Sequence, residues 1–178
     1  MSSIYEPINS EFSSHLRRFY LIPELWEKFN ISDLGAIDFS KWKMVKMMND
    51  DGEISEDTKK IPTAHGGIYI YTILPPVVPQ CGGYIMYVGM ASKTSSENLR
   101  SRVRSYKSQF GDSYTRDRIH NLFANWGKYV YVYYLPVAAD EKVILELETR
   151  LIGCLIPPCN SDIRDVAVKK RVKAFAEF

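Results

Sequence analysis

Two runs of aromatic and β-branched residues constrain the fold of this chain most strongly. The first, "GIYIYTIL", spans residues 67–74 and ends at two prolines, which cannot continue a β-ladder. The second, "YIMYVG", spans residues 84–89 and follows after a short loop, so the pair predicts an antiparallel hairpin. Each strand carries a tyrosine close to a glycine, Tyr69 in the first and Tyr87 in the second.

The residues that follow alternate between helical and extended patterns. Apolar residues recur every three or four positions over residues 97–110 and 114–126, which predicts two amphipathic helices. Residues 128–135, "KYVYVYYL", predict a third strand ended by Pro136, and residues 140–155 predict a further helix. The predicted fold class is therefore α+β, with a small three-stranded antiparallel sheet flanked by helices.

The flanking sequence divides the 178 residues into a core and two appended segments. Residues 1–62 predict an N-terminal helical accessory segment, which includes short amphipathic stretches at 13–22 and 24–29. Residues 63–163 form the predicted core, and residues 164–178 predict a basic C-terminal helix that packs on it. A chain of this length can bury a core of its own, so we expect one domain with appendages.

Charge is segregated along the chain although the net charge is only +2. Between Met90 and Lys128, eight lysines and arginines stand against three acidic residues. This segregation is consistent with a surface that faces phosphate groups, and it is equally found in many solvated helices.

The sequence also predicts a cytoplasmic protein. No apolar run approaches the roughly 18 residues that span a bilayer, and the N-terminus lacks a secretory signal pattern. The three cysteines and three histidines lack the spacing of a zinc site, so we expect reduced thiols and no structural zinc.

One carboxylate falls in the apolar stripe of the predicted helix 140–155. Glu148 shares this stripe with Ile144, Leu151 and Ile152. A buried carboxylate is costly unless an opposite charge, hydrogen bonds or a metal ion compensate it. The pattern alone leaves open whether Glu148 pairs with an arginine or serves a functional site.

Together these segments resemble the GIY-YIG nuclease family. Residues 67–69 match the first signature triplet, and residues 87–89 match a common variant of the second. The segment "LRSRVRSY" resembles the family's helix with its catalytic arginine, here Arg102. Glu148 fits the family's metal-binding glutamate, and Asn160, twelve residues later, fits its asparagine. The resemblance covers about residues 66–162, a little over half of the chain.

The resemblance implies that the protein hydrolyses phosphodiester bonds. Hydrolysis of a phosphodiester needs a deprotonated water, positive charge around the phosphate and stabilisation of the leaving oxygen. By resemblance, Tyr69 assists the deprotonation, Tyr87 positions water or phosphate, and Arg102 binds the phosphate. Glu148 would hold one Mg²⁺ or Mn²⁺ ion per active site. The implied catalytic residues are Tyr69, Tyr87, Arg102, Tyr106, Glu148 and Asn160.

Each of these residues also has a structural interpretation. Tyr69 and Tyr87 could be strand aromatics that only pack, and Arg102 could be a solvated residue on a helix flank. Asn160 follows two prolines and could be a turn residue that bonds its own backbone. If every structural interpretation were correct, the residues would match the order of the family's motifs only by coincidence. This favours the nuclease interpretation.

The resemblance thus implies a metal-dependent endonuclease that cuts DNA and leaves 5'-phosphate and 3'-hydroxyl ends. We expect a stand-alone enzyme of restriction or defence type that acts on double-stranded DNA, with no membrane partner and with monomer or dimer left open. The alternative is a nucleic-acid-binding or interaction module that does not cut. Met90 stands where several relatives have lysine, so Lys93 either takes that role or contacts DNA. The predicted DNA contacts are Lys93, Arg100, Arg104, Lys107, Arg116 and Arg118.

Overall fold

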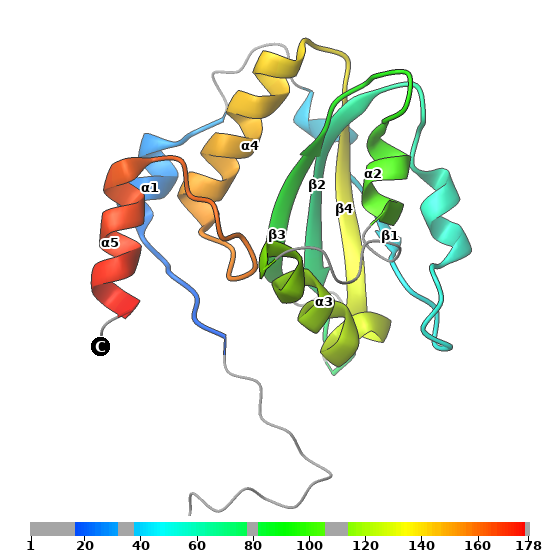
Figure 1. The fold of residues 1–178 in the computed structure, drawn as a ribbon, viewed down its shortest axis with the longest axis horizontal. Coiled ribbons are helices and arrows are strands. Elements are labelled where there is room, and N and C mark those ends of the chain that lie inside the picture. Colours follow the sequence, from blue (N-terminus) through cyan, green and yellow to red (C-terminus); the bar gives the residue numbers. More distant parts are fainter. Residues whose placement is uncertain (1–16, 32–37, 78–81, 106–113, 177–178) are drawn as a thin grey trace, which may run out of the picture.

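A four-stranded antiparallel sheet in the order β1-β4-β2-β3 forms the centre of the fold (Figure 1). The computed structural model describes residues 17–31, 38–77, 82–105 and 114–176. The α+β class is confirmed. The central strands are β2 and β4, and the edge strands are β1 and β3. Their bounds are β1 Lys43–Lys46, β2 Gly66–Ile73, β3 Tyr84–Ala91 and β4 Val130–Val137.

β1 is an additional strand, so the prediction of a three-stranded sheet was wrong by one. It lies in the segment expected to be helix and loop, and it pairs with β4 from Lys43 opposite Tyr134 to Lys46 opposite Tyr131. The predicted end of β4 at Pro136 was also wrong, because the strand continues to Val137. Since β1 does not extend beyond Tyr134, β4 has a partner on one side only at Pro136, where a strand tolerates a missing donor.

Helices cover both faces of the sheet. α3 (Tyr114–Trp126) has the predicted bounds, and α4 (Glu141–Leu155) begins one residue after its predicted start. α2 (Leu99–Ser105) begins later than predicted because Asn98 and Ser101 cap its first turn reciprocally, through bonds of 2.9 and 3.0 Å between side chain and backbone. The predicted continuation of this helix over residues 106–110 lies outside the described residues.

The remaining helical elements flank this core. The prediction of a helix over residues 13–22 was wrong for its described part, residues 17–22, which form no helix. Pro23 disfavours a helical conformation at the residue before it, and it begins α1 (Pro23–Lys28). α5 (Val166–Ala176) occupies the predicted C-terminal helix. Short 3₁₀ turns are η1 (Phe39–Lys41), η2 (Glu56–Lys60) and η3 (Gly127–Tyr129).

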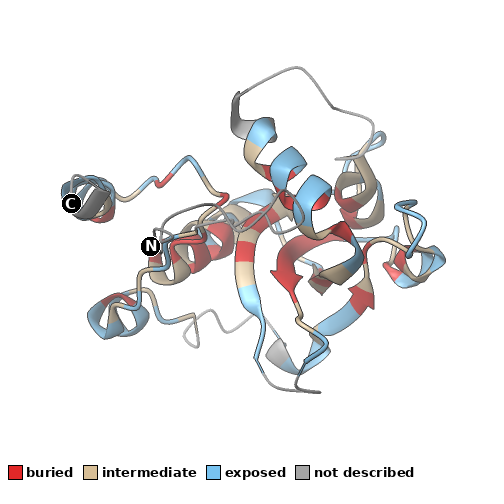
Figure 2. Ribbon diagram, turned by 90° about the horizontal axis from the view of Figure 1, so that it is seen from below, coloured by how far each residue is buried: buried red, intermediate tan, exposed pale blue. Residues whose placement is uncertain are grey.

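Side-chain alternation in β2 divides the core into two layers. Tyr69 and Tyr71 face α2 and α3, whereas Ile68 and Ile70 face α4. Every residue of β2 is buried, so this strand lies between both helical layers (Figure 2). In Figure 1, α1 and α5 lie beyond α4, on the side away from α2.

The described residues before position 62 and after position 164 also contribute to these layers. Met47 and Ile61 belong to the layer of α2 and α3, and Leu25 and Val168 belong to the layer of α4. The boundaries of the accessory segment and of the C-terminal segment stay predictions. Along the described parts of the chain, no helix combines the length and apolar character needed to cross a membrane.

Candidate active site

The two signature tyrosines lie close together on neighbouring strands. The ring centroids of Tyr69 and Tyr87 are 6.1 Å apart. Tyr69 pairs with Gly89 across the strands, and a Cβ atom at Gly89 would lie only 2.4 Å from the Tyr69 hydroxyl oxygen. The missing side chain at Gly89 therefore makes the space that the Tyr69 phenol fills. Tyr69 is fully buried and Tyr87 is half-buried, so Tyr87 is the more accessible of the two rings.

The glycine of the first triplet is required by the close pairing of β2 with β4. Gly67 has a φ of +149°, which L side chains rarely adopt. A Cβ atom there would lie 2.1 Å from the carbonyl oxygen of Leu135. Both signature glycines thus permit close approaches that hold the tyrosine-bearing strands in place.

Tyr71 fixes α2 against the sheet. Its hydroxyl donates a hydrogen bond of 3.0 Å to the carbonyl oxygen of Val103, in the middle of α2. The Tyr71 ring also stacks on Tyr87, with centroids 5.9 Å apart and an interplanar angle of 26°. Because Arg102 precedes Val103, these contacts set where the Arg102 side chain leaves the helix.

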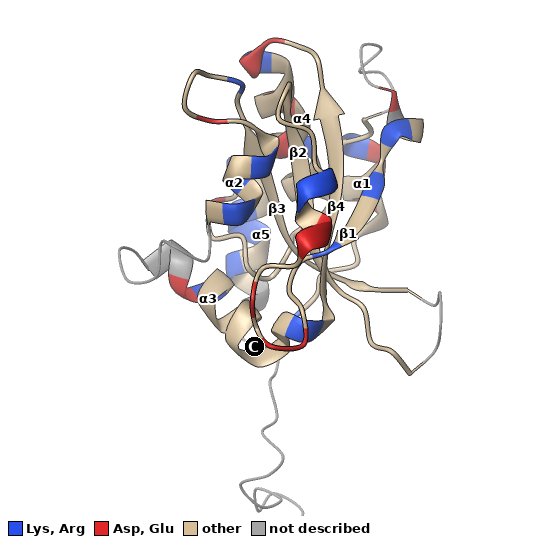
Figure 3. Ribbon diagram, turned by 90° about the vertical axis from the view of Figure 1, so that its right-hand side faces the viewer, with Lys and Arg blue, Asp and Glu red and all other residues tan. Residues whose placement is uncertain are grey.

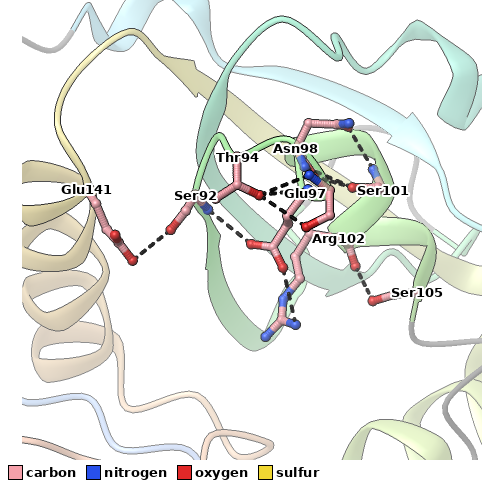
Figure 4. Close-up of polar contacts among 9 residues, drawn as sticks. Ser92, Thr94, Glu97, Asn98, Ser101, Arg102, Ser105 and Glu141 are labelled. Atoms are coloured by element: carbon pink, nitrogen blue, oxygen red, sulfur yellow. Dashed lines mark hydrogen bonds and ion pairs between the residues drawn. The ribbon is translucent and has the colours of Figure 1, made fainter.

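The loop between β3 and α2 holds an acidic side chain against Arg102 (Figure 4). Glu97 accepts a hydrogen bond of 3.2 Å from the backbone N–H of Ser92, and its other carboxylate oxygen lies 3.8 Å from Nη1 of Arg102. Ser92 also donates from its hydroxyl to Glu141 at the start of α4, at 2.8 Å. Glu97 was not predicted as a site residue, because nothing in the sequence pattern links an acidic residue before a basic helix to an arginine of that helix.

Glu148 lies at the inner side of α4 with 8% of its surface exposed. Burial raises the pKa of this carboxyl, and the charge of Arg164, a hydrogen bond with the backbone of Met90 and the charge of Arg102 oppose that increase. Arg164 Nη2 lies 3.6 Å from the carboxylate. An arginine does pair with Glu148, but Arg164 lies at the surface and is not a buried partner, so this pairing does not decide between the two alternatives.

The charge of Arg102 lowers the pKa of Glu148 although their helices pack on opposite faces of the sheet. Arg102 lies on α2 and Glu148 on α4, and β3 is the edge strand that both helices contact. The negative charge of Asp162 adds to the increase in the pKa of Glu148, so a second carboxylate lies nearby. Arg164 and Asp162 were not predicted as site residues, because they follow the proline loop and belong to no motif.

Asn160 completes the edge of the sheet. Its side-chain oxygen accepts a hydrogen bond of 2.9 Å from the N–H of Val88, and its side-chain nitrogen donates one of 2.8 Å to the carbonyl oxygen of Val88. The neighbouring N–H of Cys159 donates to the carbonyl oxygen of Met86 at 2.9 Å. The side chain of Asn160 thus bonds a distant strand and not its own backbone, and any catalytic effect would pass through β3.

Two of the predicted DNA contacts instead connect α2 to η2. Nε of Arg100 donates to the carbonyl oxygen of Ile61 at 2.6 Å, and Nη1 of Arg104 donates to the hydroxyl of Thr58 at 2.6 Å. Figure 3 shows basic positions along α2. A role in binding DNA is not needed to explain either side chain.

The other predicted contacts differ in their surroundings. Lys93 is exposed on the loop before α2. Arg118 donates from Nη1 to the carbonyl oxygens of Pro158 and Asn160, both at 3.4 Å. Tyr106, Lys107 and the side chain of Arg116 lie outside the described residues.

The described thiols are poor nucleophiles. Burial raises the pKa of both Cys154 and Cys159 to about 11, so both are protonated at neutral pH. Within the described ranges, no group of three or more His, Cys, Asp or Glu residues is arranged to hold a metal ion. Any ion at this site would rely on Glu148, with Asp162 as the nearby second carboxylate.

Comparisons with protein-family models, curated proteins and solved structures gave no match to this chain.

Proposed function

We propose that this protein is a metal-dependent endonuclease of the GIY-YIG type that hydrolyses phosphodiester bonds in DNA. The sequence resemblance supports the proposal. So does one structural observation: α2, which carries Arg102, and α4, which carries Glu148, both pack against β3 from opposite faces of the sheet, and the charge of Arg102 lowers the pKa of Glu148. β3 also carries Tyr87 and Gly89. A guanidinium, a carboxylate and a phenol beside one edge strand of the sheet suit phosphate chemistry.

The contacts of Glu97 indicate where a phosphate would bind. A carboxylate that accepts from a backbone N–H and faces a guanidinium has the charge and the hydrogen-bond acceptors of a phosphate group. The scissile phosphate would displace Glu97 and bind Arg102 in its place. Glu97 would thus keep weakly bound anions away from Arg102, and only a DNA strand that is held by further contacts would replace it.

The two tyrosines, Tyr69 and Tyr87, would act on the attacking water. The resemblance assigns deprotonation of the water to Tyr69 and the positioning of water or phosphate to Tyr87. The complete burial of Tyr69 favours Tyr87 as the phenol that meets the water, with Tyr69 supporting it from below. Their separation of 6.1 Å between ring centroids allows the two rings to be positioned as a pair.

Glu148 is the residue that would hold Mg²⁺ or Mn²⁺. The donor set fits, because Mg²⁺ retains several waters and is commonly bound through one or two carboxylates. An ion held there would supply Lewis-acid stabilisation of the charge on the leaving 3' oxygen. Because burial raises the pKa of Glu148, binding of a cation and ionisation of the carboxyl would be coupled.

A nicking assay tests this proposal. Supercoiled plasmid incubated with the protein and Mg²⁺ or Mn²⁺ should be nicked, and Glu148→Gln should reduce the rate about a hundredfold or more. Glu146→Gln is the matched control, because Glu146 lies on the same helix, is exposed and pairs with Arg150 at 2.7 Å. End-labelled duplexes should give 5'-phosphate and 3'-hydroxyl ends.

Two outcomes count against the proposal. Equal nicking by the wild-type protein and Glu148→Gln would attribute the activity to a contaminant. Binding of DNA by the wild-type protein, without cleavage in any metal or on any substrate, would favour the non-cleaving module.

A further inference from the structure

An aromatic cavity lies at the end of the sheet where β2 ends and β3 begins. Its volume is about 440 Å³. Its lining comes from distant parts of the chain: the residues before α1, the first residues of β3, the end of α3 and η3. The aromatic residues of the lining are Phe19, Tyr84, Trp126 and Tyr129.

Two cations accompany these rings. The guanidinium carbon of Arg17, which lines the cavity, lies 5.3 Å from the centroid of the Trp126 ring. The Nζ atom of Lys128 lies 5.1 Å from the centroid of Tyr129. The charges of both Arg17 and Arg118 oppose the increase that burial causes in the pKa of Cys159. Arg17 thus lines the cavity, and its charge also acts on Cys159, the residue before Asn160.

The lining favours one class of ligand. Aromatic faces stack on flat rings, and adjacent cations attract a phosphate that accompanies such a ring. Among the described residues that line the cavity, Arg17 alone carries a charge. Phe19 is 38% exposed and Tyr84 is 53% exposed, and their centroids lie 5.7 Å apart, so two aromatic rings remain available to a ligand. A lipid chain or an aliphatic peptide would gain nothing from the cations.

The cavity is within reach of a strand bound at the candidate active site. Met86 lines the cavity, and the backbone of Met90 bonds Glu148 four residues further along β3. Four residues of a strand span about 13 Å, at about 3.3 Å per residue. This is about four nucleotide steps at about 3.4 Å each. Ile73, Met86 and Trp126 assign the cavity to the face of the sheet that also carries Tyr69 and Tyr87.

We infer that this cavity binds a nucleobase that has left the base stack, a few nucleotides from the phosphate bound at Arg102. The inference rests on the proposed function for its choice of DNA as ligand. Because the lining offers ring faces and few hydrogen-bonding groups, the cavity should accept any base. It would then direct the protein to DNA with an unpaired or easily flipped base, and not to a base sequence.

Fluorescence of 2-aminopurine tests the inference. Two duplexes are compared in EDTA, one with a single unpaired 2-aminopurine and one in which it is paired. The wild-type protein and Glu148→Gln should bind the unpaired duplex more tightly and change its fluorescence. Tyr84→Ala and Arg17→Ala should weaken this binding about fivefold or more and remove the preference. Trp26→Ala is the matched control, because Trp26 is a 47% exposed aromatic residue of α1 outside the cavity.

The failure of this inference is distinct from the failure of the proposed function. Equal affinity for the two duplexes, or an unchanged preference in Tyr84→Ala and Arg17→Ala, would overturn the nucleobase site whatever the nicking assay shows. A cavity filled by another part of the chain would give the same negative result. A preference that depends on Tyr84 and Arg17 in a protein that never nicks DNA would support the site while refuting the nuclease. Tyr84 is exposed, so Tyr84→Ala should fold, and its melting curve verifies this.

Discussion

Glu148 is the residue at which stability and the proposed function oppose each other. A carboxylate with 8% of its surface exposed is poorly solvated, and burial raises its pKa above the ordinary value of 4.5. Arg164, Arg102 and the backbone of Met90 offset only part of this effect. A site selected for folding alone would gain from an uncharged residue here, whereas a cation-binding site needs the charge.

We therefore expect Glu148→Gln to stabilise the metal-free protein at neutral pH. The protonated form of Glu148 stabilises the fold below about pH 4.5, and this contribution is lost as the pH rises through the higher folded-state pKa. Glutamine remains neutral, so its advantage in melting temperature should be small at pH 4 and should grow toward pH 8. Melting curves in EDTA measure this difference. A constant difference across this range, or the same trend in Glu146→Gln, would contradict it.

Gly89 is the second residue with a specific expectation. An alanine Cβ would lie 2.4 Å from the hydroxyl oxygen of Tyr69 and 2.5 Å from its Cζ, and Tyr69 is fully buried and cannot move aside freely. Gly89→Ala should cost about 1–3 kcal/mol in the free energy of unfolding, and should abolish nicking under conditions where the variant remains folded. Gly82→Ala, with open space around its Cβ, should change neither. Normal activity in Gly89→Ala would separate the tyrosine geometry from catalysis.

At the scale of elements, one side of α2 holds the fold together and another side belongs to the candidate site. Arg100 and Arg104 bind η2 and the residue after it, whereas Arg102 faces Glu97, and its charge lowers the pKa of Glu148. Spacing of two residues on a helix places these side chains on different faces, which is why one basic helix can serve both purposes.

This division predicts different phenotypes for neighbouring arginines. Arg100→Ala and Arg104→Ala should each lower the free energy of unfolding by about 1–3 kcal/mol and leave the salt dependence of DNA binding nearly unchanged. Arg102→Ala should have the opposite effects: little change in stability, and weaker binding with a shallower salt dependence. Denaturant titrations and binding isotherms at several salt concentrations measure both. A shallower salt slope in Arg100→Ala would restore its predicted role as a DNA contact.

Sequence periodicity predicted those helices and strands whose conformation depends mainly on neighbouring residues in the chain. The strands around Tyr69 and Tyr87 and the helices α3 and α4 carry strong periodicity and clear terminal signals, and these were predicted nearly to the residue. β1 was missed because its four residues include Lys43 and Lys46 and gain their strand conformation from β4, far along the chain. The partners of Asn160 and Arg100 could not be predicted for the same reason, since both are carbonyl or N–H groups of distant backbone.

At the scale of the molecule, the sheet is most strongly held in its middle. β2 has a partner on each side and is buried throughout, whereas β1 has a single partner and covers half of β4. Backbone amides of β2 and of the paired part of β4 should therefore exchange with solvent most slowly, near the rate of global unfolding, and those of β1 should exchange faster. Hydrogen exchange followed by mass spectrometry tests this order. Equal protection of the β1 and β2 amides from exchange would contradict this order and would show that β1 unfolds only together with the whole sheet.

The bonds of Asn160 to Val88 also affect how copies of this protein associate at high concentration. An exposed strand edge invites strands of other molecules, and this is how many β proteins polymerise and form fibrils. Here the side-chain amide of Asn160 already bonds both backbone groups of Val88 on the edge strand β3. On the other edge strand, β1, the charge of exposed Lys43 repels the same residue of another copy. Strand addition by copies of the same chain is thereby hindered at Val88 on β3 and disfavoured at Lys43 on β1, so edge-to-edge growth at high concentration should be slow.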